Sequence, residues 1–284
     1  MVHSPMDPGK LRERVQAVIA SVSGTVAMAY INLEQPNDTL FINSDEWFHA
    51  ASTMKTPVLI EAYKQAHTLS KGIHDSILVH NQFKSILDGS LFSVELERDS
   101  GKAMHQRIGQ RVPIRELLYD MIINSGNLST NVIIDWVGAN KVTQTLRQLG
   151  IQRMEVVRGV EDMKAFETGL VNRTTARDLA LLFQHLASGT LISRQANQDM
   201  IDILLDQQFK EMIPAALPPE AKVAHKTGWI SGSVHDSGIV FLPDGRRYIL
   251  VILTKDLFEN EEGTRVGARI SDIIYKWFLS PDSK

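Results

Sequence analysis

The sequence predicts an α+β fold, in which an antiparallel sheet is flanked by helices and an all-helical lobe is inserted between the first strands and the last ones. Runs typical of strands occur towards both ends of the chain, at residues 25–33, 39–44, 222–228, 233–245 and 246–255. Between them, apolar residues recur almost entirely at helical spacing. We therefore expect residues 1–50 and 206–284 to form one α/β lobe and residues 51–205 the helical lobe, with a cleft between the lobes as the place for a site.

Each end of the chain is expected to add a helix to the α/β lobe. The first helix covers about residues 8–22, because apolar residues recur on one of its faces, at Leu11, Val15, Val18 and Ile19. The next two strands are separated by the turn-rich residues 34–38 and predict a hairpin. The turn at 243–245, Pro-Asp-Gly, joins the last two strands, and a final helix covers about residues 264–279.

The helical lobe is predicted from four runs that end at or near glycine, the expected stop for a helix. These runs are residues 114–126, 128–138, 141–150 and 175–189. The polar stretch 84–105 precedes these runs, and we expect it to be a long surface excursion within the helical lobe.

Composition excludes several function classes. The chain has no cysteine, so disulfides, thiolate zinc sites and cysteine nucleophiles are excluded. Its 30 basic and 33 acidic residues are dispersed, which argues against nucleic acid as a partner. No apolar stretch is long enough to span a membrane, and the first residues lack the apolar core of a signal peptide. The chain as given would therefore be cytoplasmic.

The first candidate pair lies in the stretch HAASTMKTPVLIEAY, residues 49–63, where Ser52 and Lys55 precede an apolar helical run. On a helix they share a face about one turn apart. A buried amine with a lowered pKa can take the proton of a serine hydroxyl, and a helix N-terminus offers N–H groups to an oxyanion. Alternatively, Ser52 is a helix cap and Lys55 a solvated first-turn residue.

Two further motifs follow along the chain. The stretch NSGN places Ser125 and Asn127 at a break between two helical runs, where capping is the alternative role. The stretch HKTG places Lys226, Thr227 and Gly228 on a predicted strand. A lysine there also suits a solvated strand edge, whereas a glycine in a strand allows something to approach the backbone.

Taken in order, Ser-x-x-Lys, Ser-x-Asn and Lys-Thr-Gly resemble the motifs of the class A β-lactamases and the related penicillin-binding proteins. The resemblance covers about residues 20–280 and implies a β-lactamase/transpeptidase-like fold, with an insertion near 84–105. It implies that Ser52 attacks an amide carbonyl and becomes acylated, that Lys55 relays its proton, and that Ser125 passes a proton to the departing nitrogen.

The same resemblance implies the binding residues. Asn127 would hold the acyl side chain of the substrate and orient the catalytic lysine. Lys226 and Thr227 would bind the substrate carboxylate beside Gly228. The oxyanion hole would be formed by the backbone N–H groups of Ser52 and Trp229.

Class A enzymes also need a glutamate that activates water and releases the acyl group, within a Glu-x-x-x-Asn motif. Glu161 lies at the family's distance from the Ser-x-Asn motif, but Ala165 replaces the asparagine. Asn172 lies too far along the chain to be a simple substitute, and Asp162 and Glu167 are rival carboxylates. We favour Glu161 as the base.

A second departure is His235, which occupies the place where many members carry a carboxylate-binding arginine. Protonated, it could bind the substrate carboxylate; otherwise it pairs with Asp236 on the strand. The expected protein is thus a serine hydrolase that acts on β-lactams without cofactor or metal, as a monomer. The alternatives are a penicillin-binding DD-peptidase or esterase with slow or absent deacylation, and a sensor that is acylated once. The resemblance also implies export from the cytoplasm.

Overall fold

The computed structural model describes residues 8–35, 37–68 and 72–280. Its strands are β1 (Thr25–Asn32), β2 (Thr39–Ile42), β3 (Phe48–His49), β4 (Ser76–Leu78), β5 (Phe83–Lys84), β6 (Leu91–Phe92), β7 (Arg111–Pro113), β8 (Arg173–Thr174), β9 (Lys222–Ile230), β10 (Ser233–Phe241) and β11 (Arg247–Lys255). Its α-helices are α1 (Pro8–Ile19), α2 (Lys55–Thr68), α3 (Lys102–His105), α4 (Ile114–Ile123), α5 (Asn127–Val137), α6 (Ala139–Gln148), α7 (Met163–Glu167), α8 (Ala176–Ser188), α9 (Arg194–Leu205) and α10 (Asn260–Phe278). Three short 3₁₀ helices are η1 (Ala51–Met54), η2 (Leu96–Arg98) and η3 (Pro214–Ala216).

Strands from both ends of the chain share one five-stranded antiparallel sheet, in the order β2-β1-β11-β10-β9. The pairing of β1 with β11 runs from Thr25 opposite Lys255 to Asn32 opposite Tyr248. The predicted α+β fold and its antiparallel sheet are therefore confirmed. Strand β9, which carries Lys226, forms one edge of the sheet.

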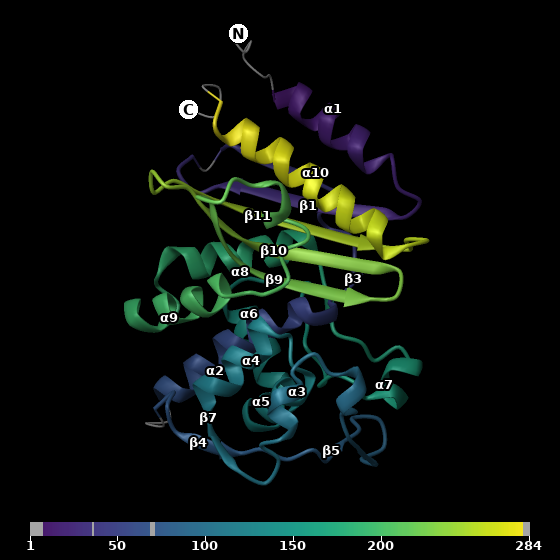
Figure 1. The fold of residues 1–284 in the computed structure, drawn as a ribbon, viewed down its shortest axis with the longest axis vertical. Helices are drawn as coiled ribbons and strands as arrows, with labels where there is room; N and C mark the ends of the chain where they lie inside the picture. The colour runs from purple at the N-terminus through teal and green to yellow at the C-terminus, as the bar shows by residue number, and fades with distance from the viewer. Residues whose placement is uncertain (1–7, 36, 69–71, 281–284) are drawn as a thin grey trace.

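Both faces of the sheet are covered, which explains why its central strands β1, β10 and β11 are buried at almost every position. In β1, Val26, Met28 and Tyr30 belong to the core under α1 and α10, whereas the alternating alanines and Ile31 belong to the core shared with the helical part. Helices α1 and α10, from opposite ends of the chain, pack together above the sheet (Figure 1).

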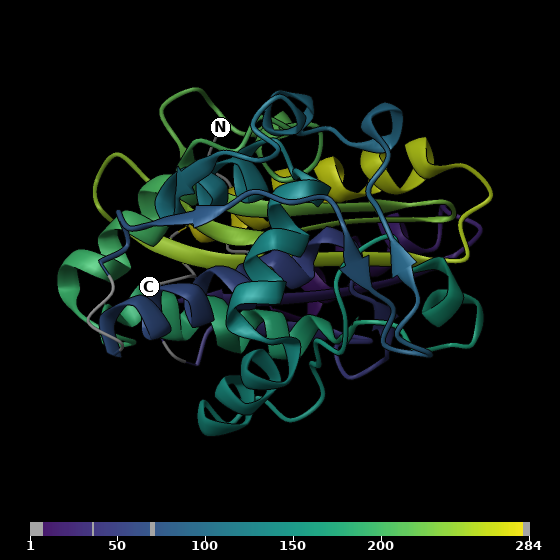
Figure 2. The same cartoon turned by 90° about the horizontal axis from the view of Figure 1, so that it is seen from below.

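The helical part lies on the other side of the sheet, and Figure 2 shows it in front when the molecule is viewed from below. Helix α2 packs against α4, α5 and α6 at its centre. Helix α8 belongs to the range expected in the inserted lobe, yet it packs against β1, β10 and β11. One continuous apolar core therefore joins this face of the sheet to the helices, and the division into two lobes at 51–205 stays a prediction.

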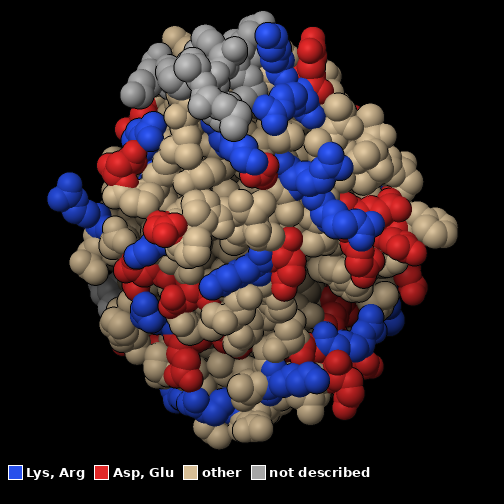
Figure 3. Space-filling model, turned by 45° about the horizontal axis from the view of Figure 1, so that its top comes forward, with Lys and Arg blue, Asp and Glu red and all other residues tan. Residues whose placement is uncertain are grey.

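The stretch 84–105, expected as a surface excursion, contains β6, η2 and α3 and also contributes a buried carboxylate, Asp99. Within the described ranges, no helix has both the length and the apolar character needed to cross a membrane. Basic and acidic side chains are interspersed over the face shown in Figure 3.

Candidate active site

Ser52 lies in η1, the single 3₁₀ turn that leads into α2, rather than in the α-helix itself. The preceding Ala51 has a positive φ of 44°, a conformation that L-residues adopt at a cost, and its N–H donates to Nδ1 of His49 over 2.9 Å. A Cβ added at Gly228 would lie 3.2 Å from the backbone nitrogen of Ser52 and 3.1 Å from Cβ of Ala51. The glycine of HKTG thus lets strand β9 approach the backbone of the serine closely.

Lys55 is fully buried at the first position of α2, and its amine contacts the Ser-x-Asn loop. Its Nζ donates to the backbone oxygen of Ser125 at 2.7 Å, to Oγ of Ser125 at 3.2 Å and to Oδ1 of Asn127 at 3.0 Å. Burial lowers the pKa of the Lys55 amine to about 8, although three nearby carboxylates act in the opposite direction. An appreciable fraction of this amine is therefore neutral near pH 7 and able to accept a proton.

Ser125 stands between α4 and α5 with a positive φ of 56°. Its Oγ accepts a hydrogen bond from Nζ of Lys226 at 3.1 Å as well as the one from Lys55. Lys226 is also fully buried, and burial, followed by the positive charge of Lys55, lowers the pKa of its amine well below the ordinary value. Because both lysines donate to this oxygen, the hydroxyl proton of Ser125 is free to point elsewhere.

Asn127 connects the lysine to the candidate base. Its Oδ1 accepts from Lys55, and its Nδ2 donates to Oε1 of Glu161 at 2.7 Å. The rival Asp162 is buried and accepts from Ser85 and Ile86 while capping α7, so its carboxylate is occupied elsewhere. The other rival, Glu167, is exposed on α7. Of the three acids, Glu161 is the one that shares the cleft with the candidate nucleophile.

Two buried carboxylates under this site had no signal in the sequence. Asp99 accepts from the backbone N–H groups of Gly101, Asn127 and Leu128 at 2.8–2.9 Å, and so caps α5 from outside the helix. Burial raises the pKa of Asp99, but the three N–H groups outweigh it and the pKa is lowered. A Cβ at Gly126 would lie 2.1 Å from Oδ2 of Asp120, so this acid is the reason for glycine between Ser125 and Asn127.

Two asparagines hold the segment that carries Glu161. Asn131 accepts from the backbone nitrogen of Val160 and donates to its oxygen. Asn172 accepts from the backbone N–H groups of Val157 and Arg158 and donates to the oxygen of Arg158. Asn172, which sequence spacing placed too far from Glu161 to replace Ala165, therefore positions the backbone of this segment. Ala165 itself is fully buried.

His235 lies on β10 opposite Gly228, but it does not present a free donor to the cleft. It is 1% exposed, its Nδ1 accepts from the backbone nitrogen of Thr254, and its Nε2 donates to the oxygen of His49. Burial lowers its pKa to about 4. The expectation that His235 binds a substrate carboxylate is therefore wrong for this arrangement, and so is its pairing with Asp236, which instead contacts His225 at 2.8 Å.

These elements enclose a cleft of about 580 Å³. Its lining includes Ser52, Asn127, Glu161 and Trp229, which is 68% exposed at the rim. The remaining lining residues are His49, Ala51, Arg98, Arg158, Val160, Met163, Phe166, Asn172, Ile230 and Ser231. Across the described residues, no group of three acidic or histidine side chains could hold a metal ion.

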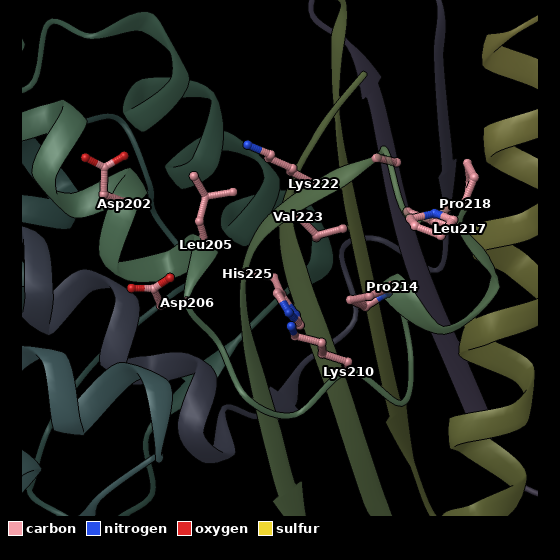
Figure 4. A pocket seen from close by; sticks show the side chains of 12 residues that line it. Asp202, Leu205, Asp206, Lys210, Pro214, Leu217, Pro218, Lys222, Val223 and His225 are labelled. Carbon is pink, nitrogen blue, oxygen red and sulfur yellow. The ribbon is translucent and has the colours of Figure 1, made fainter. Parts of the chain in front are cut away.

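A second hollow, of about 660 Å³, lies between α9 and the other side of β9 (Figure 4). Figure 4 shows Lys210 and Lys222 from its walls and His225 between them. His225 neighbours Lys226 in sequence, but successive strand residues point to opposite faces. This hollow therefore contains none of the predicted site residues.

Comparison with known proteins gives the chain's relatives. A family model described as "Beta-lactamase enzyme family" matches residues 10–278. A β-lactamase of Bacteroides uniformis is 26% identical over 176 residues, which span 58% of this chain and 60% of that protein. The extended-spectrum β-lactamase PER-1 of Pseudomonas aeruginosa is 21% identical over 95% of this chain and 87% of its own length. A solved β-lactamase structure from Chitinophaga pinensis, 24% identical, covers 94% of this chain and 98% of its own with a TM-score of 0.81.

Proposed function

The chain belongs to the β-lactamase enzyme family, whose reaction is hydrolysis of the β-lactam amide bond, and we propose that Ser52 is the nucleophile of that reaction here. One observation carries the assignment: the amines of Lys55 and Lys226 converge on the hydroxyl of Ser125 at 3.2 and 3.1 Å. The helix and the strand that carry these two lysines, α2 and β9, both contact the 3₁₀ turn that carries Ser52. Burying two amines against one hydroxyl costs stability, and such buried groups with shifted pKa values cluster at functional sites.

In the acylation step, neutral Lys55 accepts the proton of Ser52 while Oγ attacks the β-lactam carbonyl carbon. The backbone N–H groups of Ser52 and Trp229 stabilise the resulting oxyanion, at a contribution of about 3 kcal/mol for one such donor. When the C–N bond breaks, Ser125 gives its proton to the departing nitrogen. Protonated Lys55 then restores the proton of Ser125 through their 3.2 Å contact.

The carboxylate of the substrate binds at Lys226 and Thr227. Its negative charge offsets the burial of the Lys226 amine and so favours the charged form of that lysine. His235 takes no part, because both of its ring nitrogens are already bonded. Small β-lactams or related acyl donors are thus the partners of this site, and we expect the protein to act as a monomer.

In the deacylation step, Glu161 takes a proton from water as the water oxygen attacks the ester carbonyl, and the same proton passes to Oγ of Ser52 as the C–O bond breaks. The hydrogen bond from Asn127 holds one oxygen of Glu161, leaving the other for water. The asparagine that assists this glutamate in the class A pattern is replaced by buried Ala165. This difference favours a second candidate, a penicillin-binding peptidase or esterase that acylates readily and deacylates slowly.

Intact-protein mass spectrometry during reaction with a penicillin tests both candidates. A transient adduct with accumulating product supports the β-lactamase, a long-lived adduct that still yields product supports the slow enzyme, and a permanent adduct supports a sensor. The absence of any adduct, or an adduct that persists in Ser52→Ala, would refute Ser52 as the nucleophile. Glu161→Gln should prolong the adduct, whereas the matched variant Glu167→Gln, in the same segment but exposed, should not.

A further inference from the structure

One wall of the cleft contains a buried positive charge that forms no direct ion pair among the described residues and is attracted only at longer range, by the carboxylate of Asp162. Arg158 is only 6% exposed, and its Nε and Nη1 donate to the backbone oxygens of Leu170 and Gly159. Over the described part of the chain, it forms no ion pair with a carboxylate. Burying an unpaired charge is costly, so this position favours an anion from outside the protein.

A second side chain in the same wall lacks an acceptor. The ring of His49 meets that of Phe166 edge-on at 5.9 Å, and the guanidinium of Arg158 lies 5.9 Å from the centre of the Phe166 ring. Because Nδ1 of His49 accepts from Ala51, the ring proton resides on Nε2. That Nε2 is buried with no hydrogen-bond partner among the described residues. Burial, together with the charges of Arg158 and His235, lowers the pKa of His49 to about 4, so the ring is a neutral donor.

The charge balance of the whole cleft is positive. Arg98, exposed at the end of η2, also lines it and forms no ion pair within the described ranges. The one carboxylate in the described lining is Glu161, which already accepts from Asn127. The described lining thus contains two guanidinium groups and one N–H donor without an acceptor, but only one carboxylate, one oxygen of which already accepts a hydrogen bond.

The position of this wall indicates which part of a substrate would reach it. The lining contains Ser52, Asn127 and Trp229 but neither Lys226 nor Thr227. In the proposed reaction the first three residues face the acyl half of the substrate, and the last two face the carboxylate of the leaving half. We infer that His49, Arg158 and Phe166, with Arg98 on the same cleft, form a subsite for a carboxylate at the end of the substrate's acyl side chain. The inference rests on the proposed function and names the substrate class of the same site.

The test uses pairs of cephalosporins that share one chromogenic nucleus. Their acyl side chains are succinyl, glutaryl or adipyl, each ending in a carboxylate or in the isosteric primary amide. Wild-type protein should acylate faster from the acid than from the amide of at least one pair, by about tenfold in kcat/KM, as an Arg–carboxylate hydrogen bond of about 1.4 kcal/mol would give. The preference should shrink as salt is added, because Arg98 is exposed.

Variants assign the preference to particular side chains. Arg158→Gln should bring the acid-to-amide ratio close to one, and Arg158→Lys, which keeps the charge but loses the planar fork, should keep part of it. Because Arg158 also holds two backbone oxygens, Arg98→Gln provides an exposed second variant and should lower the ratio without a change in thermal stability. The matched control is Arg194→Gln on α9, an exposed arginine outside the cleft, which should keep the wild-type ratio.

The acid-to-amide ratio of kcat/KM distinguishes loss of the carboxylate subsite from a purely structural effect of a substitution, which would slow acylation by the acid and by the amide alike. Equal kcat/KM for acid and amide in all three pairs would overturn the inference and leave the proposed function intact. A preference that persists in both Arg158→Gln and Arg98→Gln would also overturn it. Failure of every compound to acylate the protein would refute the proposed function itself, and with it this inference.

Discussion

The buried amine of Lys55 makes the rate of acylation strongly dependent on pH. With a pKa of about 8, the neutral form amounts to about 1% at pH 6 and about half at pH 8. If this amine accepts the proton of Ser52, the second-order rate constant of acylation should therefore rise about 50-fold between these two pH values and level off above pH 9.

Stopped-flow measurement with a chromogenic cephalosporin at limiting concentration gives this rate constant directly. The decisive comparison is Glu161→Gln, because the negative charge of Glu161 raises the pKa of Lys55. Removing that charge should move the midpoint of the profile to lower pH even though deacylation becomes slower. The control Glu167→Gln removes an exposed charge from the same segment and should leave the midpoint unchanged.

Two results would refute this reasoning. A rate constant that changes by less than about threefold between pH 6 and pH 8 would mean that Lys55 is not the titrating base. A midpoint that rises in Glu161→Gln would contradict the electrostatic coupling between the carboxylate and the amine, because loss of a negative charge must favour the neutral amine.

Three further substitutions test the construction of the site. Gly228→Ala should lower the acylation rate about tenfold while the protein still folds, because the new Cβ lies 3.1–3.2 Å from the turn that carries Ser52 and must displace it. Stopped-flow kinetics and circular dichroism measure the two effects. Asp99→Asn should reduce the free energy of unfolding in urea by about 1–3 kcal/mol at pH 7. The difference between wild type and variant should vanish as pH falls through the lowered pKa of the Asp99 carboxylate. A constant difference down to pH 2 would argue against Asp99 as an ionised cap of α5. Ala165→Asn, which recreates the class A pattern, should destabilise the protein by about 1–3 kcal/mol without faster deacylation, since position 165 is fully buried. Met163→Asn, at an exposed position of the same helix, is the control. Faster turnover in Ala165→Asn would contradict the prediction.

The sheet and most helices could be predicted because their signals are local. Strand β1 is apolar at every position between Thr25 and Asn32 since both of its faces are covered. Helix α8 ends at Gly189, which has the positive φ that favours glycine at a helix C-terminus. The packing of α8 on the sheet could not be predicted, because periodicity shows that a helix has an apolar face but not which partner covers that face.

The motif residues were found in sequence because their spacing is characteristic, but their surroundings were not. Asp99 lies in a polar stretch that reads as surface, and its burial depends on the N–H groups of α5, which are distant in sequence. Arg158 likewise gave no signal, since neither the burial of its side chain nor its lack of a direct ion pair can be seen in the sequence. His235 was placed at the correct strand position, yet contacts with His49 and Thr254 from other strands decide what its ring can do.

The same burial that makes Lys55 a base should also make the protein's stability depend on pH. Its pKa is lowered in the folded state, so between about pH 8 and its ordinary value of 10.5 the unfolded chain binds more protons than the folded one, and stability from this group must rise with pH. Between pH 7 and pH 9.5 the gain is about 2 kcal/mol. Urea unfolding should show this gain in wild type relative to Lys55→Met, in which the group is absent. Equal pH dependence of the two proteins would mean that Lys55 is not buried as the contacts with Ser125 and Asn127 require.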